Sequence, residues 1–154
     1  MSEEYPDVRG AGPPRSRDTA RLSWSELSAQ PRFITDTRVH FGRWLEQLEL
    51  DSTKTYDIIL AVYEAMANVV EHAYRSQGAT ATPNVFDLNA TLEDSRLEVA
   101  VVDHGTWSDA VPGPLRGRGL PLIETLSDDV TVASAESGTT VTMAWDIDSR
   151  SIVS

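Results

Sequence analysis

The stretch Ile58–Tyr74 reads I-I-L-A-V-Y-E-A-M-A-N-V-V-E-H-A-Y, and its apolar residues recur at intervals of three and four. This spacing places them on one face of a helix. Ile59 and Val70 widen that face. The stretch therefore predicts a long amphipathic helix against which the other elements pack. Its buried stripe comprises Ile58, Val62, Met66, Val69 and Ala73.

The same helix carries a row of polar residues beside the apolar stripe. Glu64 and Asn68 are four residues apart, so their side chains lie on one face, and Glu71 and His72 extend the row. A carboxylate and an amide at this spacing can hold an activated water and a hard cation together. For Glu64 and Asn68 alone, a solvated helix face is the competing interpretation. His72 is kept as a candidate cofactor-binding residue, although helix packing is the simpler explanation.

Composition excludes several classes of protein. The chain has 154 residues, enough for one domain with a core, and a formal net charge of −11. This charge argues against binding to nucleic acid or to an anionic membrane, and it suits a basic protein partner or simple solubility. Without cysteine there is no disulfide framework and no thiolate zinc site. No signal peptide or apolar run of membrane-spanning length is visible, so we expect a cytoplasmic protein.

The two ends of the chain set the expected domain limits. Residues 1–20 combine proline, glycine and charge with few large apolar side chains, which predicts a disordered tail. We expect one domain over residues 21–148 and a short tail over residues 149–154.

The amino-terminal part of this domain predicts a strand and a first helix before the long one. Arg21–Leu27 alternates loosely, as a short edge strand would. Asp51, Ser52 and Thr53 supply N-cap candidates for the long helix, which we expect to end near Gly78. The first helix follows Pro31, and its apolar face is expected at Phe33, Val39, Trp44, Leu45 and Leu48.

After Pro83 the hydrophobic period changes to two. Residues 85–92 and 97–102 predict a hairpin turned at 93–95, and a long loop covers residues 106–119. A short helix at Leu120–Leu126 and a second hairpin, with strands at 130–133 and 139–145 and a turn at Ser137-Gly138, complete the domain. Strands that arrive as hairpins predict a largely antiparallel sheet with helices on one face. The expected fold class is an α+β two-layer sandwich.

Two further motifs carry chemistry. Asp103 ends a strand and Gly105 follows, so a carboxylate can accept a hydrogen bond from an exocyclic amine such as that of adenine. An ordinary strand-ending turn is the alternative, and His104 faces either solvent or the edge of the ring.

In Arg116-Gly117-Arg118-Gly119-Leu120, glycines open a helix whose first backbone N–H groups can bind an anion, with two guanidinium groups nearby. A flexible turn is the alternative there. The sequence contains no Walker A loop, and Gly138-Thr139-Thr140-Val141 means little by itself.

Taken together, the four motifs closely resemble the GHKL nucleotide-binding fold, also called the Bergerat fold, of gyrase, Hsp90, histidine kinases and MutL. They occur in the order E-A-x-x-N-x-x-x-H-A-Y, D-x-G, G-R-G-L and G-T-T-V. Within that superfamily the chain resembles the anti-sigma factor serine/threonine kinases of the bacterial stress-response and sporulation type. The wordings L-A-V-x-E-A-x-x-N and G-R-G-L-x-L-I are characteristic of these short kinases, and the resemblance covers residues 32–145.

The resemblance implies a role for each matching residue, with ATP and Mg²⁺ as cofactors. Asn68 would be the metal ligand, and Glu64 would be the catalytic general base. Asp103 would hold the adenine amine, with Gly105 and Thr140 around the ring. The phosphates would lie against Gly117, Gly119 and the N–H groups that begin at Leu120, and Arg116 or Arg118 would meet the γ-phosphoryl charge.

The function implied is that of an ATP-dependent protein-serine/threonine kinase. Such a kinase binds a sigma factor, and it phosphorylates an anti-anti-sigma factor of the STAS type, which is the antagonist of the kinase. The resemblance is also compatible with a homodimer. A non-catalytic nucleotide-binding module that sequesters its partner is the alternative, but a pure binder has no chemical need for Glu64. A histidine kinase would need a phosphoacceptor histidine in a dimerising helix, and His40 lacks that context.

Overall fold

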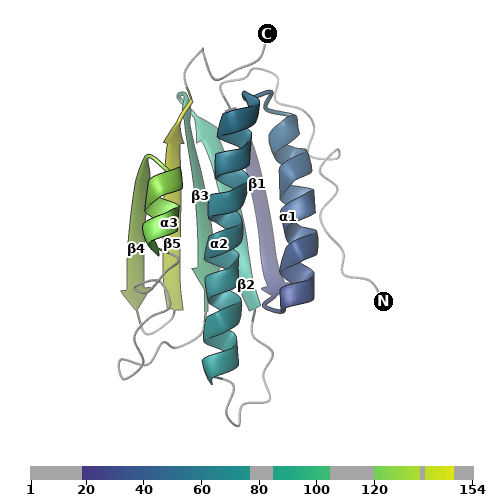
Figure 1. Ribbon diagram of the computed structural model, residues 1–154, viewed down its shortest axis with the longest axis vertical. Coiled ribbons are helices and arrows are strands. Elements are labelled where there is room, and N and C mark those ends of the chain that lie inside the picture. The colour runs from purple at the N-terminus through teal and green to yellow at the C-terminus, as the bar shows by residue number, and fades with distance from the viewer. Residues whose placement is uncertain (1–18, 77–84, 105–119, 136–137, 148–154) are drawn as a thin grey trace.

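The computed structural model describes residues 19–76, 85–104, 120–135 and 138–147, with the backbone alone at 72–76 and 135. Within these ranges, three helices lie against one face of a five-stranded sheet (Figure 1). The expected order of elements is confirmed. They are β1 (Thr19–Ser28), α1 (Pro31–Glu46), α2 (Ser52–Ser76), β2 (Val85–Glu93), β3 (Arg96–Asp103), α3 (Leu120–Leu126), β4 (Asp129–Ala135) and β5 (Gly138–Asp146).

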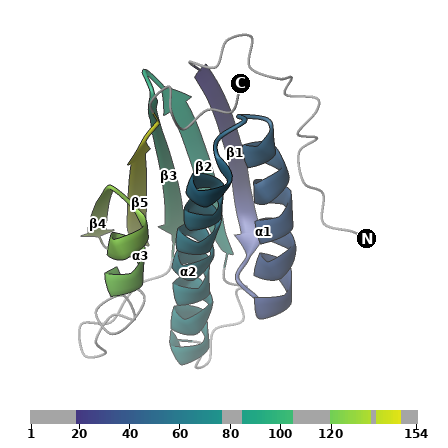
Figure 2. The same ribbon diagram turned by 45° about the horizontal axis from the view of Figure 1, so that its top comes forward.

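The sheet has the strand order β1-β2-β3-β5-β4, and every neighbouring pair is antiparallel. After β3 the chain passes through α3 to the outer strand β4, and β5 then returns between β3 and β4. The predicted α+β two-layer sandwich is confirmed. Figure 2 shows the three helices on the same side of the sheet when the molecule is tilted, so among the described residues one face of the sheet is covered by helices and the other face is open.

Local sequence explains how the strands turn. Asp94 and Ser95 join β2 to β3 with φ angles of 53° and 62°, and two left-handed residues in succession match the twist of a tight hairpin. The register from Phe86↔Asp103 to Glu93↔Arg96 is unbroken. β1, by contrast, has a bulge between Trp24 and Leu27. The strand predicted at Arg21–Leu27 is therefore confirmed as a longer edge strand whose carboxyl-terminal half is irregular.

The two long helices begin as the sequence predicts. Pro31 occupies the first turn of α1, where its missing N–H is not needed. The carboxylate oxygen Oδ1 of Asp51 accepts a hydrogen bond of 2.8 Å from the backbone N–H of Lys54, which confirms Asp51 as the N-cap of α2. α2 is described as far as Ser76, and its expected end near Gly78 lies outside the described residues.

One assignment on α1 is wrong. Val39 was expected on the buried face, yet its side chain is 44% exposed. It lies two residues from both Thr37 and Phe41, which are buried, so it points about 200° away from them around the helix. The buried residues of α1 are Ile34, Thr37, Phe41, Trp44 and Leu45, with Phe33 half-buried.

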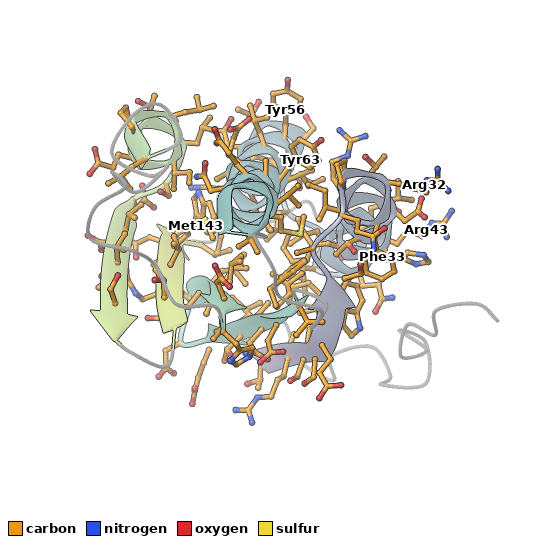
Figure 3. The ribbon with its side chains drawn as sticks, turned by 90° about the horizontal axis from the view of Figure 1, so that it is seen from below. Arg32, Phe33, Arg43, Tyr56, Tyr63 and Met143 are labelled. Carbon is orange, nitrogen blue, oxygen red and sulfur yellow. The ribbon has the colours of Figure 1, made fainter. Side chains whose placement is uncertain are left out.

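The core lies between the helices and the covered face of the sheet. Ile58, Val62, Met66 and Val69 of α2 are all at most 5% exposed, as the helical period predicts, while the side chain of Ala73 lies outside the described set. Seen from below in Figure 3, α2 lies between α1 and α3, Met143 lies between β5 and α2, and Tyr56 and Tyr63 lie on the outer side of α2. The central helix therefore presents one face to the sheet and another to solvent. The strand residues that complete the core include Leu88, Val99, Val101, Met143 and Trp145.

The open face of the sheet carries a charged cluster centred on Arg96. Arg96 of β3 donates hydrogen bonds to Asp129 of β4 at 2.8 Å and to Asp146 of β5 at 2.9 Å. The hydrogen bond to Asp129 raises the pKa of Arg96 above its ordinary value, and partial desolvation opposes this shift. A single guanidinium group thus ties three adjacent strands together at one end of the sheet.

Candidate functional site

The described part of the chain buries four polar or charged side chains, of which Asn68 and Asp103 are predicted site residues and a third lies beside Asp103. The fourth is Thr37, whose hydroxyl donates to the carbonyl oxygen of Phe33 at 3.0 Å within α1. The others are Asn68 at 7% exposure, Asp103 at 4% and Thr139 at 2%. Buried polar groups cost stability unless they are paired, and of these three residues Asn68 alone has a side-chain atom, Nδ2, without a hydrogen-bond partner in the described part of the chain.

α2 places Glu64 and Asn68 differently. Asn68 is buried among the apolar residues of the helix, whereas Glu64, one turn earlier, is half-exposed. In the part of the chain that the structure describes, the side-chain nitrogen Nδ2 of Asn68 has no hydrogen-bond partner. Leaving a buried amide group unsatisfied costs about 1–3 kcal/mol, which is reasonable for a group that serves a ligand. The arrangement places the partly exposed carboxylate of Glu64 one turn before the buried amide of Asn68.

The amide of Asn68 fits one part of a magnesium site. Mg²⁺ prefers oxygen ligands and usually keeps several waters, so a single amide oxygen together with substrate phosphates is a common way to hold it. Across residues 19–71, 85–104, 120–134 and 138–147, no three His, Cys, Asp or Glu side chains come together as a metal site. A dedicated all-protein cage is therefore missing from the described ranges, and the donor set suits a metal that arrives with its ligand.

Asp103 and Thr139 share the helix-covered face of the sheet. Asp103 is the last residue of β3, and its Cα partner in β5 is Thr139. The hydroxyl oxygens of Thr139 and Ser134 lie 3.3 Å apart, which joins β5 to β4 beside Asp103. A carboxylate and a hydroxyl are thus presented together at the ends of two adjacent strands.

The expected position of Thr140 is corrected by this register. Thr140 pairs with Val102, one residue before Asp103, and successive side chains of a strand point to opposite faces of the sheet. Thr140 therefore lies on the open face, away from the carboxylate of Asp103. Strand alternation would have identified Thr139 instead, because it lies two residues before Val141, which is buried.

Gly138 explains how two distant motifs come together. Its φ angle is +144°, a conformation that residues with a side chain rarely adopt, and a Cβ there would overlap the backbone carbonyl of Asp103. The first residue of β5 therefore packs directly on the backbone at the end of β3. Glycine is required at this point of contact between the G-T-T and D-x-G motifs.

His104 lies on the open face. Its Nε2–H donates to the carboxylate oxygen Oδ2 of Asp87 at 2.8 Å, and its side chain is 49% exposed. Of the two alternatives for this residue, the structure therefore selects the one facing solvent, and it adds a partner that the sequence did not indicate.

Several predicted site residues lie outside the described part of the chain. They are Gly105, Arg116, Gly117, Arg118 and Gly119, together with the side chain of His72. Leu120 begins α3 and is half-buried against the core, and Ile123 one turn later is fully buried. The predicted bounds of this short helix are confirmed, and α3 packs against α2 and β4.

The five-stranded antiparallel sheet with three helices on one face agrees with the nucleotide-binding fold that the sequence motifs predict. A family model described as the histidine kinase-like ATPase domain matches residues 27–145. The chain belongs to this family.

Individual proteins support the same assignment. The chain is similar to a serine-protein kinase, RsbW, from Bacillus licheniformis, with 30% identity over 131 residues that cover 75% of this chain and 79% of the relative. For the Bacillus velezensis protein of the same name the identity is 31% over 134 residues, covering 77% and 81%. A crystal structure of the RsbU and RsbW domains of a Mycobacterium tuberculosis protein has a similar fold, with a TM-score of 0.66 and 23% identity. This likeness covers 88% of the present chain but only 35% of that longer one.

None of the helices in the described ranges has both the length and the hydropathy that a membrane crossing requires.

Proposed function

We propose that this protein is an ATP-dependent protein-serine/threonine kinase that binds a sigma factor and phosphorylates an anti-anti-sigma factor of the STAS type. The observation that carries the proposal is the pairing on α2 of an accessible Glu64 with a buried Asn68 whose Nδ2 has no described partner. The relatives named serine-protein kinase RsbW support this activity. A cytoplasmic location, where such partners would be found, and a homodimer belong to the same proposal.

The adenine base would bind at the end of β3. The carboxylate of Asp103 would accept a hydrogen bond from the exocyclic amine, and the hydroxyl of Thr139 lies on the same face of the sheet. We assign Thr139 the place beside the ring that the resemblance gave to Thr140, because only Thr139 shares the covered face. Gly138 and Gly105 would leave room for a flat ring next to the backbone.

The phosphates would extend from the base towards the start of α3. The backbone N–H groups from Gly117 to Leu120 would bind phosphate oxygens, and Arg116 or Arg118 would neutralise the charge of the γ-phosphoryl group. The side-chain oxygen of Asn68 would hold Mg²⁺, which supplies positive charge to the phosphates when bound. His72, one turn after Asn68 on α2, would lie near this end of the nucleotide.

Glu64 would act as the general base. The hydroxyl oxygen of the substrate serine or threonine forms a bond to the γ-phosphorus atom, and the bond from that atom to the β–γ bridging oxygen breaks, so that ADP leaves. The proton of the hydroxyl passes to the Glu64 carboxylate. The partial exposure of Glu64 is consistent with this role, because the substrate hydroxyl has to reach it from outside.

Glu64→Gln tests the proposal. The substitution keeps the shape of the side chain and removes the base, so Mg-ATP and partner binding should persist while phosphate transfer falls by about 10²–10⁴-fold. Transfer is measured by incubating the protein with Mg-ATP and candidate STAS proteins and locating phosphate by mass spectrometry. If wild type and variant bind Mg-ATP equally and neither transfers phosphate to any candidate, the protein is a nucleotide-dependent binding module rather than a kinase.

A further inference from the structure

The carboxylate of Asp87 connects three strands on the open face of the sheet. Its Oδ2 accepts a hydrogen bond of 2.8 Å from Nε2–H of His104, at the end of β3, and its Oδ1 accepts one of 2.8 Å from the backbone N–H of Glu26, in β1. The side chain of Asp87 is only 21% exposed. Both oxygens are therefore in use, and this fixes the orientation of the carboxylate.

The contact in β1 lies at the irregular point of that strand. Glu26 has a φ angle of 57°, in the left-handed region, and belongs to the bulge between Trp24 and Leu27. A bulge removes ladder hydrogen bonds and leaves backbone groups without a strand partner. Asp87 supplies the acceptor for the Glu26 N–H, so the bulge and the end of β3 are held by the same side chain.

The contact in β3 lies directly behind the predicted adenine site. His104 follows Asp103, and Phe86, which precedes Asp87, is the Cα partner of Asp103 in β2. On the other flank, Gly138 of β5 packs against the backbone carbonyl of Asp103. The backbone of Asp103 and His104 is thus held by a side chain from β2 and by the main chain of β5.

We propose that Asp87 and His104 are positioning residues for nucleotide binding. The carboxylate–imidazole hydrogen bond on the open face fixes the backbone at the end of β3, and this orients the Asp103 carboxylate on the covered face. The inference rests on the proposed function, because it takes Asp103 to be the residue that binds the base. Neither Asp87 nor His104 touches the nucleotide in this account.

An ordinary surface ion pair would fix the backbone at the end of β3 less firmly. Exposed pairs between flexible side chains contribute little, because both partners lose conformational freedom and solvent screens the charges. Asp87 differs because most of its side chain is buried and a backbone N–H already holds it. His104 needs to order only its own imidazole to gain this hydrogen bond.

The test compares His104→Ala with His104→Gln, whose amide N–H can replace the imidazole donor. We expect His104→Ala to raise the dissociation constant for ATP about 3- to 10-fold, the range that the net value of one hydrogen bond supports. KM for ATP should rise with it, while kcat at saturating ATP stays the same. His104→Gln should recover most of the loss, and adding His104→Ala to Asp87→Asn should weaken binding no further than Asp87→Asn does alone.

Asn89→Ala is the matched control. Asn89 accepts a hydrogen bond of 2.7 Å from Ser23 and so also joins β2 to β1 on the open face, but two residues further from the end of β3. It should leave ATP binding unchanged. Amide hydrogen exchange should accelerate at the end of β3 in His104→Ala and not in Asn89→Ala.

Two outcomes would overturn the inference, and they are distinguishable. If wild-type protein binds ATP and His104→Ala binds it equally well, the positioning role is wrong and the proposed function stands. If wild-type protein does not bind Mg-ATP at all, both fail together.

Discussion

The two faces of the central sheet differ in how exposed their polar side chains are. On the open face, Asp87 and Arg96 each bind partners from neighbouring strands, and their side chains remain partly exposed. On the helix-covered face, Asp103 and Thr139 are buried among apolar residues, close to a helix that buries Asn68. The charges of the open face are paired and partly solvated, whereas the Nδ2 of Asn68, beneath the covered face, is buried without a hydrogen-bond partner in the described part of the chain, which costs stability. We therefore expect the nucleotide site on the covered face.

Gly138→Ala should have the largest effect, because it strains the contact between β5 and β3. A backbone held in a conformation that residues with a side chain avoid costs about 1–3 kcal/mol, and the overlap with the Asp103 carbonyl adds to this. We expect a loss of about 2–4 kcal/mol in the free energy of unfolding, measured by urea denaturation, and weaker ATP binding in the protein that remains folded.

Gly42→Ala is the control for this substitution. A Cβ at Gly42, in the interior of α1, would meet Cδ1 of Ile59 at 3.4 Å, close to an ordinary van der Waals distance. Alanine favours helix by about 1 kcal/mol over glycine, so stability should be unchanged or higher. If both variants lost stability equally, the requirement for glycine at 138 would not be special.

Asn68→Ala should remove the dependence of ATP binding on magnesium. Wild-type affinity for ATP should rise when Mg²⁺ is added, and the variant should show no such rise, as measured by calorimetry with and without the metal. Because the Asn68 Nδ2 has no described hydrogen-bond partner to lose, the free energy of unfolding should change by less than about 1 kcal/mol. A variant whose affinity still increases normally with Mg²⁺ would place the metal ligand elsewhere.

Arg96→Ala should have the smallest effect and should confine it to the open face. Its bonds to Asp129 and Asp146 are exposed to solvent, so salt screens them and their loss should lower the thermal midpoint only slightly, more at low ionic strength than at high. ATP affinity should not change. A clear loss of ATP binding in this variant would mean that the two faces are not independent.

The sequence predicted those features that depend on local periodicity. The stripe from Ile58 to Val69 and the cap at Asp51 follow from side-chain spacing and N-cap chemistry within a few residues, and both are confirmed. The strands of both hairpins were found in the same way, from alternation, while the turn expected at Ser137 lies outside the described residues. These signals are strong because the forces that produce them act between neighbours in the chain.

The errors have a common physical cause. Val39 was placed by an approximate helical spacing, and an offset of two residues reverses the face of a helix. Thr140 was predicted beside the adenine ring, but the register places it on the open face, because one residue reverses the face of a strand. The bond between Asp87 and His104 depends on the register of β2 with β3, which local patterns do not fix. Contacts between elements therefore required the structure.

The most direct test changes one carboxylate to an amide on each face of the same strand. Asp103→Asn removes the proposed acceptor for the adenine amine on the covered face of β3, and Glu98→Gln makes the equivalent change at an exposed residue on its open face. Calorimetry should show ATP affinity falling about 10- to 100-fold for Asp103→Asn, the value of a charge-assisted hydrogen bond, and remaining at the wild-type value for Glu98→Gln. A folded Asp103→Asn protein that binds ATP as tightly as wild type would contradict the assignment of the nucleotide site to the covered face.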